Sequence, residues 1–410
     1  MNEGKKATKN IVMLYGLNLA QLVLPLFTLP YLTRVLSVDG YGVVNYVRAV
    51  MGYTTLIIEF GFILSGTKEI VDAKNDKEKI GKIVGKITQG KLILTIVSFI
   101  LLLVMIKFIP ILSRYPLFSI LSFVPAFLSI FLFDYLFRGL EKMQILTIRY
   151  LITKGISTVL TFIVIKNDSD INLIPILDII GTVVAIIWIY YELKNNSIKI
   201  KFVPIKEVLQ NLRLSFIYFL SSIATTAFGA LNTICVGIYL SSADVAYWGV
   251  VMSLVGAVQS MYAPISDGIY PNMIKTKSLN LFFKIILFFI PFLLAGSLIL
   301  AFGSNLIITI IGGAKYLYAA KYLKECILLL IISFFSVLFG WPLLGAIGKV
   351  KETTFTTILT SILQALGLVI LIISHLFTIE LLILLRTLTE LFMALLRLRY
   401  AFKFKYEFKK

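Results

Sequence analysis

The sequence predicts an all-α integral membrane protein of about twelve transmembrane helices, arranged as two six-helix lobes related by internal pseudo-symmetry around a central cavity. Three observations support this fold class. The mean hydropathy is +0.94, and 59% of the 410 residues are hydrophobic while only 15% are charged. Apolar runs of roughly 20 residues, each long enough to cross the hydrocarbon core, recur from end to end. A motif near residue 36 also reappears half a chain later.

The apolar runs define the predicted helices in chain order. They cover residues 11–32, 42–64, 87–109, 117–137, 145–165, 173–191, 214–239, 245–265, 281–302, 326–346, 355–374 and 379–396. The short alternating strands of an outer-membrane barrel do not appear in the sequence. The first run follows a basic start and is too long for an ordinary signal sequence, so we expect it to be retained as a helix.

The repeated motif indicates a duplicated unit. Leu36-Ser37, Asp39 and Tyr-Gly-Val-Val at 41–44 have counterparts in Leu240, Ser241, Asp244, Tyr247, Gly249, Val250 and Val251. Chance similarity is the alternative in a chain rich in Leu and Val, but the order of the polar and small residues favours duplication. We expect an N-terminal six-helix lobe at 1–200 and a C-terminal six-helix lobe at 201–410 that ends in a short basic cytoplasmic tail.

Most of the loop lysines and arginines fall on one side of the predicted membrane topology. They gather at the N-terminus and at 68–86, 138–149, 194–213, 275–277, 349–351 and 397–410, whereas the alternate loops hold few. Because positive charge marks the cytoplasmic side, both termini are predicted to be cytoplasmic. We expect a multi-pass membrane protein in contact with membrane lipids along its spans and its basic aromatic tail.

Several classes of function are disfavoured by composition and motifs. The net charge of +18 is dispersed over loops instead of forming one face, so nucleic acid is not an expected partner. Cys235, Cys326 and the single histidine His375 form no metal-ligand pattern, and no cofactor is expected. Gly-Ala-Ile-Gly-Lys at 345–349 lacks the spacing of a phosphate-binding loop. We expect a protein that is not an enzyme and that carries no ATPase of its own.

Charged residues inside the predicted spans are the candidates for function, because an ionisable group in hydrocarbon normally faces a cavity or a partner. The first half holds Arg34, Arg48, Glu59, Asp134, Arg138, Arg149, Lys154 and Asp178, and the second holds fewer, among them Asp267, Glu325, Glu380, Arg386 and Glu390. The first half is the more cationic within the membrane. An anionic substrate group is therefore expected to dock mainly there.

Each of these candidates has a structural alternative. Four of them, Arg34, Arg138, Arg149 and Lys154, can snorkel to the headgroup region. Asp134 lies four residues before Arg138, as Arg386 does before Glu390, and such spacing also suits purely structural ion pairs. Asp178 can bond neighbouring hydroxyl groups.

The chain resembles the Wzx-like polysaccharide biosynthesis flippases, which transport O-antigen and capsule repeat units. The resemblance rests on residues 18–34 with two prolines, Asp-Gly-Tyr-Gly at 39–42, Glu-Phe-Gly-Phe at 59–62, Ser-Gly-Thr-Lys-Glu-Ile at 65–70, Tyr-Trp-Gly at 247–249 and Pro-Ile-Ser-Asp-Gly-Ile-Tyr-Pro at 264–271. It spans essentially the whole chain. It implies the fold of the multidrug/oligosaccharidyl-lipid/polysaccharide exporter superfamily, working by alternating access.

The resemblance also implies a substrate and roles for residues. Arg34, Arg48 and Arg138 become candidates for holding the pyrophosphate and sugar of an undecaprenyl-pyrophosphate-linked oligosaccharide, with Lys154 as a further candidate, because a guanidinium fork suits phosphate oxygens. The candidates for coupling to a cation or proton are Glu59, Asp134, Asp178 and Asp267. A polysaccharide polymerase is a further partner that the resemblance leaves open.

Two other functions stay open at this point. A cation-coupled multidrug exporter of the same superfamily shares the helix plan but would favour an acidic or aromatic cavity. A membrane glycosyltransferase or polymerase would need a substantial outer loop bearing carboxylates or arginines, and the predicted outer loops are short.

Overall fold

The computed structural model describes residues 3–73 and 76–408, without the side chains of 3–11, 221, 224–230 and 271. The basic positions counted above at Lys74, Lys409 and Lys410, and the side chains of Lys5, Lys6 and Lys9, lie outside the described residues. The chain forms two compact units, Met1–Thr226 and Ala227–Lys410, and the division falls within a single helix, α10. Each unit is described by itself below.

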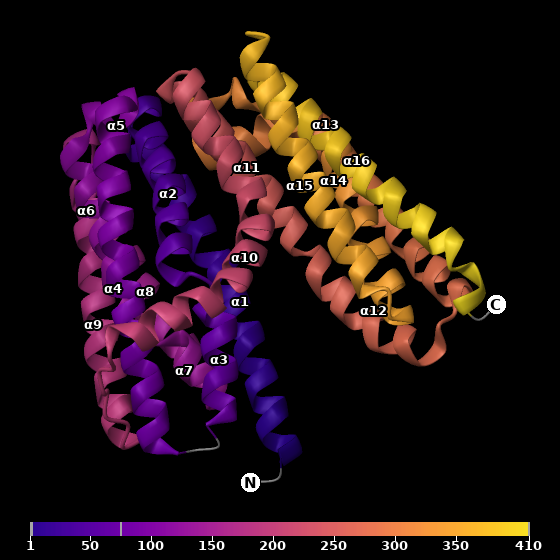
Figure 1. Ribbon diagram of the computed structural model, residues 1–410. Coiled ribbons are helices and arrows are strands. Elements are labelled where there is room, and N and C mark those ends of the chain that lie inside the picture. Colours follow the sequence, from indigo (N-terminus) through magenta and orange to yellow (C-terminus); the bar gives the residue numbers. More distant parts are fainter. Residues whose placement is uncertain (1–2, 74–75, 409–410) are drawn as a thin grey trace. The chain divides into compact units, whose positions relative to one another are not determined.

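Unit 1 is a bundle of long helices with short connections (Figure 1). Its elements are α1 (Glu3–Val35), α2 (Val38–Glu59), α3 (Phe62–Asp72), α4 (Lys77–Phe108), α5 (Pro110–Arg114), α6 (Pro116–Leu128), η1 (Ser129–Leu132), α7 (Asp134–Gly139), α8 (Met143–Val164), η2 (Asp168–Asp170), α9 (Leu173–Asn195) and the first part of α10 (Ile205–Tyr239). Its core is formed by buried apolar side chains such as Phe62, Ile87, Phe133 and Phe137.

A sharp break separates α2 from α3 within what the hydropathy pattern predicts as one span. Phe60 and Gly61 both take left-handed backbone angles, with φ of 43° and 75°. Glycine adopts this conformation at no steric cost. A Cβ at Gly61 would also meet the backbone and side chain of Tyr218 on α10, while the ring of Phe60 stacks on Phe219 at 4.5 Å. The beginning of α10 is therefore packed directly on this break.

The segment before α10 is extended and lies against α4. The amide of Lys201 donates to the carbonyl oxygen of Gly81 at 3.0 Å. Gln89 of α4 bonds both the amide and the carbonyl of Val203. A Cβ at Gly81 or Gly85 would clash with carbonyl groups of this segment. Residues 199–203, which the sequence indicates as a polar linker, are thus fixed to unit 1.

Unit 2 repeats the pattern of long apolar helices (Figure 1). It contains α11 (Ser242–Ser260), α12 (Tyr262–Thr276), α13 (Leu279–Gly312), η3 (Ala314–Tyr316), α14 (Ala319–Leu338), the π-helical turn η4 (Phe339–Leu344), η5 (Gly345–Ile347), α15 (Val350–Ile373), α16 (Ile379–Lys403) and η6 (Lys405–Glu407). Phe282, Phe334, Leu338 and Leu344 are among its buried core residues.

The two copies of the repeated motif have the same local structure. Ser37 is the N-cap of α2, where its hydroxyl accepts from the amide of Gly40 at 2.9 Å. Ser241 is the N-cap of α11, where its hydroxyl accepts from the amide of Asp244 and forms a capping box. Serine is favoured at this position because its oxygen satisfies an otherwise unpaired amide at the helix start. The matching residues therefore begin corresponding helices of the two units.

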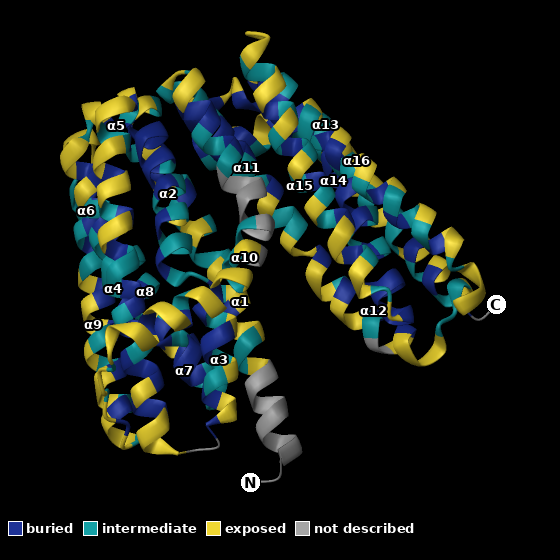
Figure 2. Cartoon of the chain, in the orientation of Figure 1, coloured by how far each residue is buried: buried dark blue, intermediate teal, exposed yellow. Residues whose placement is uncertain are grey.

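Every predicted span coincides with a long helix or with consecutive helices. Among the described residues, ten helices or helix pairs are long and apolar enough to cross a membrane. The other two long helices, α10 and α16, are 35 and 25 residues long. Exposed stretches run along the helices of both units (Figure 2), and on α13 the exposed residues include Leu287, Phe288, Phe292 and Phe302. The predicted all-α, multi-pass membrane fold is confirmed.

Candidate functional site

A polar pocket lies inside unit 1, between α2, α6, α8 and α9. Its volume is about 330 Å³, and an adjoining pocket of about 230 Å³ extends it toward α1. Arg48 of α2, Lys154 of α8 and Asp178 of α9 line both pockets. Three of the residues predicted from the sequence are thus brought together from three helices. Hereafter "the cationic pocket" means this pair of pockets.

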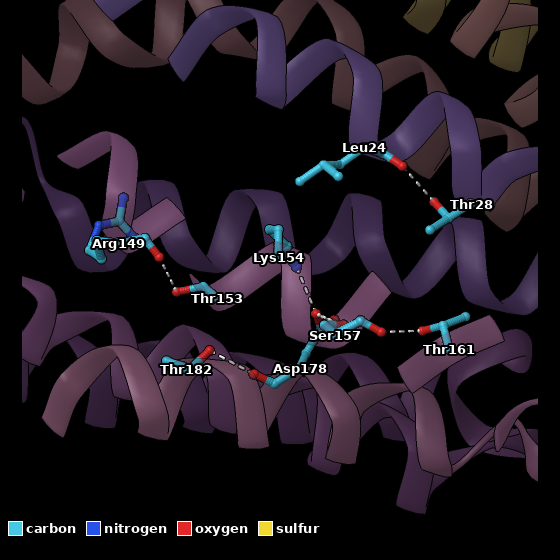
Figure 3. A network of polar contacts seen from close by, with 9 residues as sticks. All are labelled: Leu24, Thr28, Arg149, Thr153, Lys154, Ser157, Thr161, Asp178 and Thr182. Carbon is cyan, nitrogen blue, oxygen red and sulfur yellow. Dashed lines mark hydrogen bonds and ion pairs between the residues drawn. The ribbon is translucent and has the colours of Figure 1, made fainter. Parts of the chain in front are cut away.

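Asp178 is the centre of a hydrogen-bond network in the cationic pocket (Figure 3). Its Oδ1 accepts from Nζ of Lys154 at 2.8 Å and from the hydroxyl of Ser157 at 2.7 Å. The Asp178 side chain is 20% exposed, whereas that of Lys154 is 45% exposed. Lys154 therefore keeps a substantial open surface toward the pocket while its charge is partly balanced.

Arg48 is the unbalanced charge of the pocket. It is exposed and makes no hydrogen bond or ion pair with any residue in the part of the chain that the structure describes. Arg48 and Lys154 carry two positive charges and Asp178 one negative charge, so these three side chains leave the pocket with a net positive charge. A guanidinium group offers five N–H donors in a planar fork and stays protonated, so the pocket can accept an anion with several oxygens.

A stripe of hydroxyl groups on α8 forms one wall of the pocket. Thr153, Ser157 and Thr161 follow one another at intervals of four residues and therefore share a helix face. The hydroxyl of Thr153 donates to the carbonyl of Arg149 and that of Thr161 to the carbonyl of Ser157 (Figure 3). On the facing helix, Thr182 donates to the carbonyl of Asp178 at 2.7 Å. The sequence interpretation overlooked this stripe, although its four-residue spacing is visible.

A glycine contact sets the distance between α8 and α9. A Cβ at Gly181 would clash with the backbone carbonyl oxygen of Thr153. Small residues allow such a close approach of two helices in a membrane. Gly181 lies three residues after Asp178, so this contact fixes the separation across which Lys154 reaches Asp178.

We expect Gly181→Ala to lower the free energy of unfolding by about 1–3 kcal/mol, because the methyl group must push the two helices apart. The measurement is thermal or denaturant unfolding of the purified protein. Gly155→Ala on α8 is the matched control, since a Cβ there meets nothing within 4 Å. That control is expected to be neutral or to stabilise by up to about 1 kcal/mol through helix propensity. Equal loss in both variants would contradict the role given to the contact.

The remaining candidates of the first half lie elsewhere in unit 1. Arg34 is exposed at the end of α1, where Nη1 contacts the carbonyl of Pro30 at 3.4 Å. Asp134 and Arg138, whose four-residue spacing also suits an ion pair, form none among the described residues, and Asp134 instead binds Nη2 of Arg149 at 2.9 Å. The reason is that α7 has only six residues and packs on α8, which brings Arg149 to the carboxylate.

Glu59 forms a buried ion pair that the sequence interpretation missed. Its Oε1 lies 2.7 Å from Nζ of Lys91 on α4, whose residue is only 1% exposed. The same ammonium group lies 5.5 Å from the ring centre of Tyr135. The second carboxylate oxygen of Glu59 is buried without a hydrogen-bond partner among the described residues. A lysine at the fifth position of the apolar run at 87–109 was the available signal.

In the second half, Glu380 pairs with Nζ of Lys321 at 2.7 Å, and Lys321 and Glu325 line a pocket at the start of α14. Asp267 is exposed on α12. Arg386 and Glu390, whose spacing also suits a structural ion pair, form no ion pair within 4 Å in the described part of the chain, and Nη1 of Arg386 lies 3.2 Å from the sulfur of Met252. The described residues contain no cluster of three or more His, Cys, Asp or Glu side chains suited to a metal ion.

The fold and the pocket define a multi-pass α-helical membrane protein with a cationic pocket among its spans. Residues 7–277 match the family described as polysaccharide biosynthesis protein. The match covers more than half of the chain, and this protein belongs to that family. The resemblance identified from the sequence is confirmed.

Two relatives bear the name "Putative O-antigen transporter". The chain is 30% identical to the one from Shigella dysenteriae over 363 residues, which is 87% of this chain and 91% of the relative. It is 28% identical to the one from Escherichia coli (strain K12) over 327 residues, which is 77% of this chain and 78% of the relative.

The architecture is similar to solved structures of transporters. The lipid II flippase MurJ in an inward closed conformation aligns with a TM-score of 0.71 and 17% identity, covering 95% of this chain and 87% of MurJ. An inward-facing multidrug resistance MATE transporter of the MOP superfamily aligns with a TM-score of 0.70 and 13% identity, covering 93% of this chain and 97% of the transporter. At such low identity these likenesses concern the fold alone.

Proposed function

We propose that this protein is a flippase that moves a lipid-linked polysaccharide precursor across the bacterial cytoplasmic membrane, for the synthesis of a surface polysaccharide such as O-antigen. The proposed substrate is an oligosaccharide repeat unit on undecaprenyl pyrophosphate, and the proposed mechanism is alternating access. The observation that carries the proposal is the unpaired guanidinium of Arg48 beside Lys154 in the cationic pocket. The relatives named as O-antigen transporters support the substrate class.

The electrostatics of the pocket fit this task. A headgroup with two phosphates meets a large barrier in hydrocarbon, and fixed positive charge in a polar pocket lowers that barrier. The polyprenyl tail remains in the lipid, so the pocket needs to hold only the polar head. No covalent bond is made or broken, which agrees with a role as transporter and not as enzyme.

Lys154 and Asp178 offer a way to link anion binding to a proton or cation. While Asp178 is ionised, it holds the ammonium group of Lys154 at 2.8 Å. Protonation of Asp178, or its binding to another cation, frees Lys154 for a phosphate oxygen. We assign this coupling role first to Asp178 and then to Glu59, with Asp134 and Asp267 as weaker candidates. Arg34 and Arg138 are proposed to contact the headgroup only at other stages of transport.

The proposal also assigns an orientation and partners. The lysine-rich loops and both termini are placed on the cytoplasmic side, where the precursor is made. Release on the opposite side would supply a polysaccharide polymerase with its substrate. Membrane lipids contact the exposed apolar faces of both units.

Transport by reconstituted protein tests the proposal. Vesicles with lipid-linked oligosaccharide in both leaflets are treated with a membrane-impermeant glycosidase, and the fraction that becomes accessible over time reports flipping. Arg48→Ala is expected to slow flipping about tenfold or more, because a charge-assisted hydrogen bond contributes about 1.5–3 kcal/mol. Arg48→Lys, which keeps the charge but loses the fork, should be intermediate.

Arg114→Ala is the matched control, because Arg114 is exposed on α5 and does not line the pocket. Unchanged flipping by Arg48→Ala, and by the double variant with Arg34→Ala, would refute the site. A deletion strain that becomes drug-sensitive while its surface polysaccharide stays intact would instead favour a multidrug exporter.

A further inference from the structure

A second polar pocket in unit 1 lies between α3, α4 and the first part of α10. Its volume is about 520 Å³, and it does not share a lining residue with the cationic pocket. Nearly all of its lining side chains are polar or charged: Ser65, Lys68, Glu69, Asp72, Lys86, Glu207, Gln210, Asn211, Ser215 and Tyr218, with Leu214 and Ile217 as the apolar members. Hereafter it is called the α3–α10 pocket.

A rigid frame of hydrogen bonds supports the α3–α10 pocket. Glu69 accepts from Nζ of Lys86 through Oε2 at 2.7 Å and from the side-chain amide of Asn211 through Oε1 at 2.5 Å. The hydroxyl groups of Ser65 and Ser215 lie 2.9 Å apart and join α3 to α10. These contacts hold side chains from three helices in place before any ligand arrives, which lowers the entropic cost of binding.

The pocket retains unused hydrogen-bonding capacity. Asn211 is only 4% exposed, yet its Oδ1 has no hydrogen-bond partner in the described part of the chain. A buried acceptor without a donor carries a penalty of about 1–3 kcal/mol, which a ligand that donates a hydrogen bond relieves. Lys68 and Gln210 line the same pocket and make no side-chain hydrogen bond with a described residue. Donors and acceptors are thus both available.

The charge of the pocket disfavours an anionic ligand. Two ammonium groups, of Lys68 and Lys86, face three carboxylates, of Glu69, Asp72 and Glu207. This balance is the reverse of that in the cationic pocket, and a pyrophosphate would be repelled. Lys86 neutralises Glu69, which also disfavours a metal ion there. An uncharged ligand rich in hydroxyl groups meets these requirements, because each hydroxyl both donates and accepts, while Tyr218 and Leu214 offer an apolar face to its C–H groups.

We infer that the α3–α10 pocket binds sugar residues of the transported glycan, as a carbohydrate subsite separate from the pyrophosphate subsite. This inference rests on the proposed function and deepens it. The pocket lies at the lysine-rich end of α3 and α4, the side predicted to be cytoplasmic, where the substrate enters. The helix rises about 16 Å from Arg48 to the end of α2 at Glu59, at 1.5 Å per residue, and the α3–α10 pocket begins beyond the break that follows. We therefore assign this pocket to the glycan and not to the pyrophosphate group.

The test uses two probes on the full-length protein. One is the free oligosaccharide, released by mild acid from the lipid-linked intermediate that accumulates in the source bacterium when this gene is deleted. The other is undecaprenyl pyrophosphate in lipid nanodiscs. Asn211→Leu and Gln210→Ala are expected to weaken oligosaccharide binding about tenfold or more, measured by calorimetry. Binding of undecaprenyl pyrophosphate by these variants should be unchanged.

Controls separate folding effects from recognition. Gln210 is exposed and outside the Glu69 network, so Gln210→Ala keeps the test decisive if Asn211→Leu folds poorly. Arg213→Ala, exposed on the same helix but not lining the pocket, should bind both probes normally. Normal oligosaccharide binding by Gln210→Ala and Asn211→Leu, or no oligosaccharide binding by the wild-type protein, would overturn the inference.

Failure of the proposed function has a different signature. A deletion strain that accumulates no lipid-linked oligosaccharide, or undecaprenyl pyrophosphate binding that is insensitive to Arg48→Ala, contradicts the flippase itself. Loss of oligosaccharide binding in the two α10 variants, with undecaprenyl pyrophosphate binding retained, supports the carbohydrate subsite.

Discussion

Replacing Lys91 by methionine is expected to lower the free energy of unfolding by about 3–5 kcal/mol. Lys91 is 1% exposed, and its ammonium group lies 2.7 Å from the carboxylate of Glu59. Methionine fills a similar volume but leaves Glu59 as a buried charge without its partner. Removing one partner of a buried ion pair costs this much, because the remaining ion is shielded from water and no longer has an opposite charge beside it. Denaturant unfolding of the purified protein in detergent measures the change.

The double variant Lys91→Met with Glu59→Gln should recover most of the lost stability, because it removes both charges together. Lys107→Met is the matched control on the same helix, and since Lys107 is exposed its effect should stay within about 0.5 kcal/mol. If Lys91→Met and Lys107→Met unfold alike, the ion pair does not stabilise unit 1.

Replacing Arg397 by methionine is expected to destabilise unit 2 by about 3 kcal/mol or more. Arg397 is 7% exposed, and its guanidinium donates to the carbonyl of Ser336 at 2.7 Å and to the hydroxyls of Thr356 and Thr357 at 3.1 and 2.8 Å. In a regular helix the Ser336 carbonyl would bond the amide of Gly340, where the backbone angles become non-helical. Arg397 therefore donates a hydrogen bond to a carbonyl group that the helix break leaves without its usual partner. Surrounding hydrocarbon has no donor for this carbonyl.

Thermal unfolding of the purified protein measures this loss. Arg397→Lys should recover only part of it, because an ammonium group cannot reach three acceptors in the fork geometry. Arg399→Met, exposed two residues further along α16, is the control and should leave the unfolding temperature nearly unchanged. A similar unfolding temperature for Arg397→Met and Arg399→Met would show that the helix break needs no such donor.

The fold follows closely from the sequence because hydrocarbon imposes a simple rule on each span. Apolar runs of sufficient length become helices, and the short basic loops separate them. The breaks were not predicted. Phe60 and Gly61 lie within a continuous apolar run, so hydropathy alone reads 42–64 as one helix. The glycine is a signal for a left-handed turn, but only the packing of Tyr218 against it shows why the helix must break there.

The site was predicted in part. Arg48, Lys154 and Asp178 were recognised as unusual charges, but their convergence depends on how three helices pack, which no local pattern encodes. For Asp134 the local spacing was misleading. A separation of four residues suggested an ion pair with Arg138, but the packing of the helices places Asp134 beside Arg149 instead. The pair of Lys91 with Glu59 joins α4 to α2 across 32 residues of sequence, and no local spacing predicts it.

The hydroxyl stripe on α8 determines which groups can contact an anion. A hydroxyl has one hydrogen to donate, and those of Thr153 and Thr161 already donate to backbone carbonyls, as does that of Thr182 on the facing helix α9. Each retains lone pairs only, so this wall of the pocket presents oxygen atoms that repel phosphate oxygens. A phosphate group of the proposed substrate would therefore bind on the side of Arg48 and Lys154, which would fix the orientation of the headgroup in the pocket.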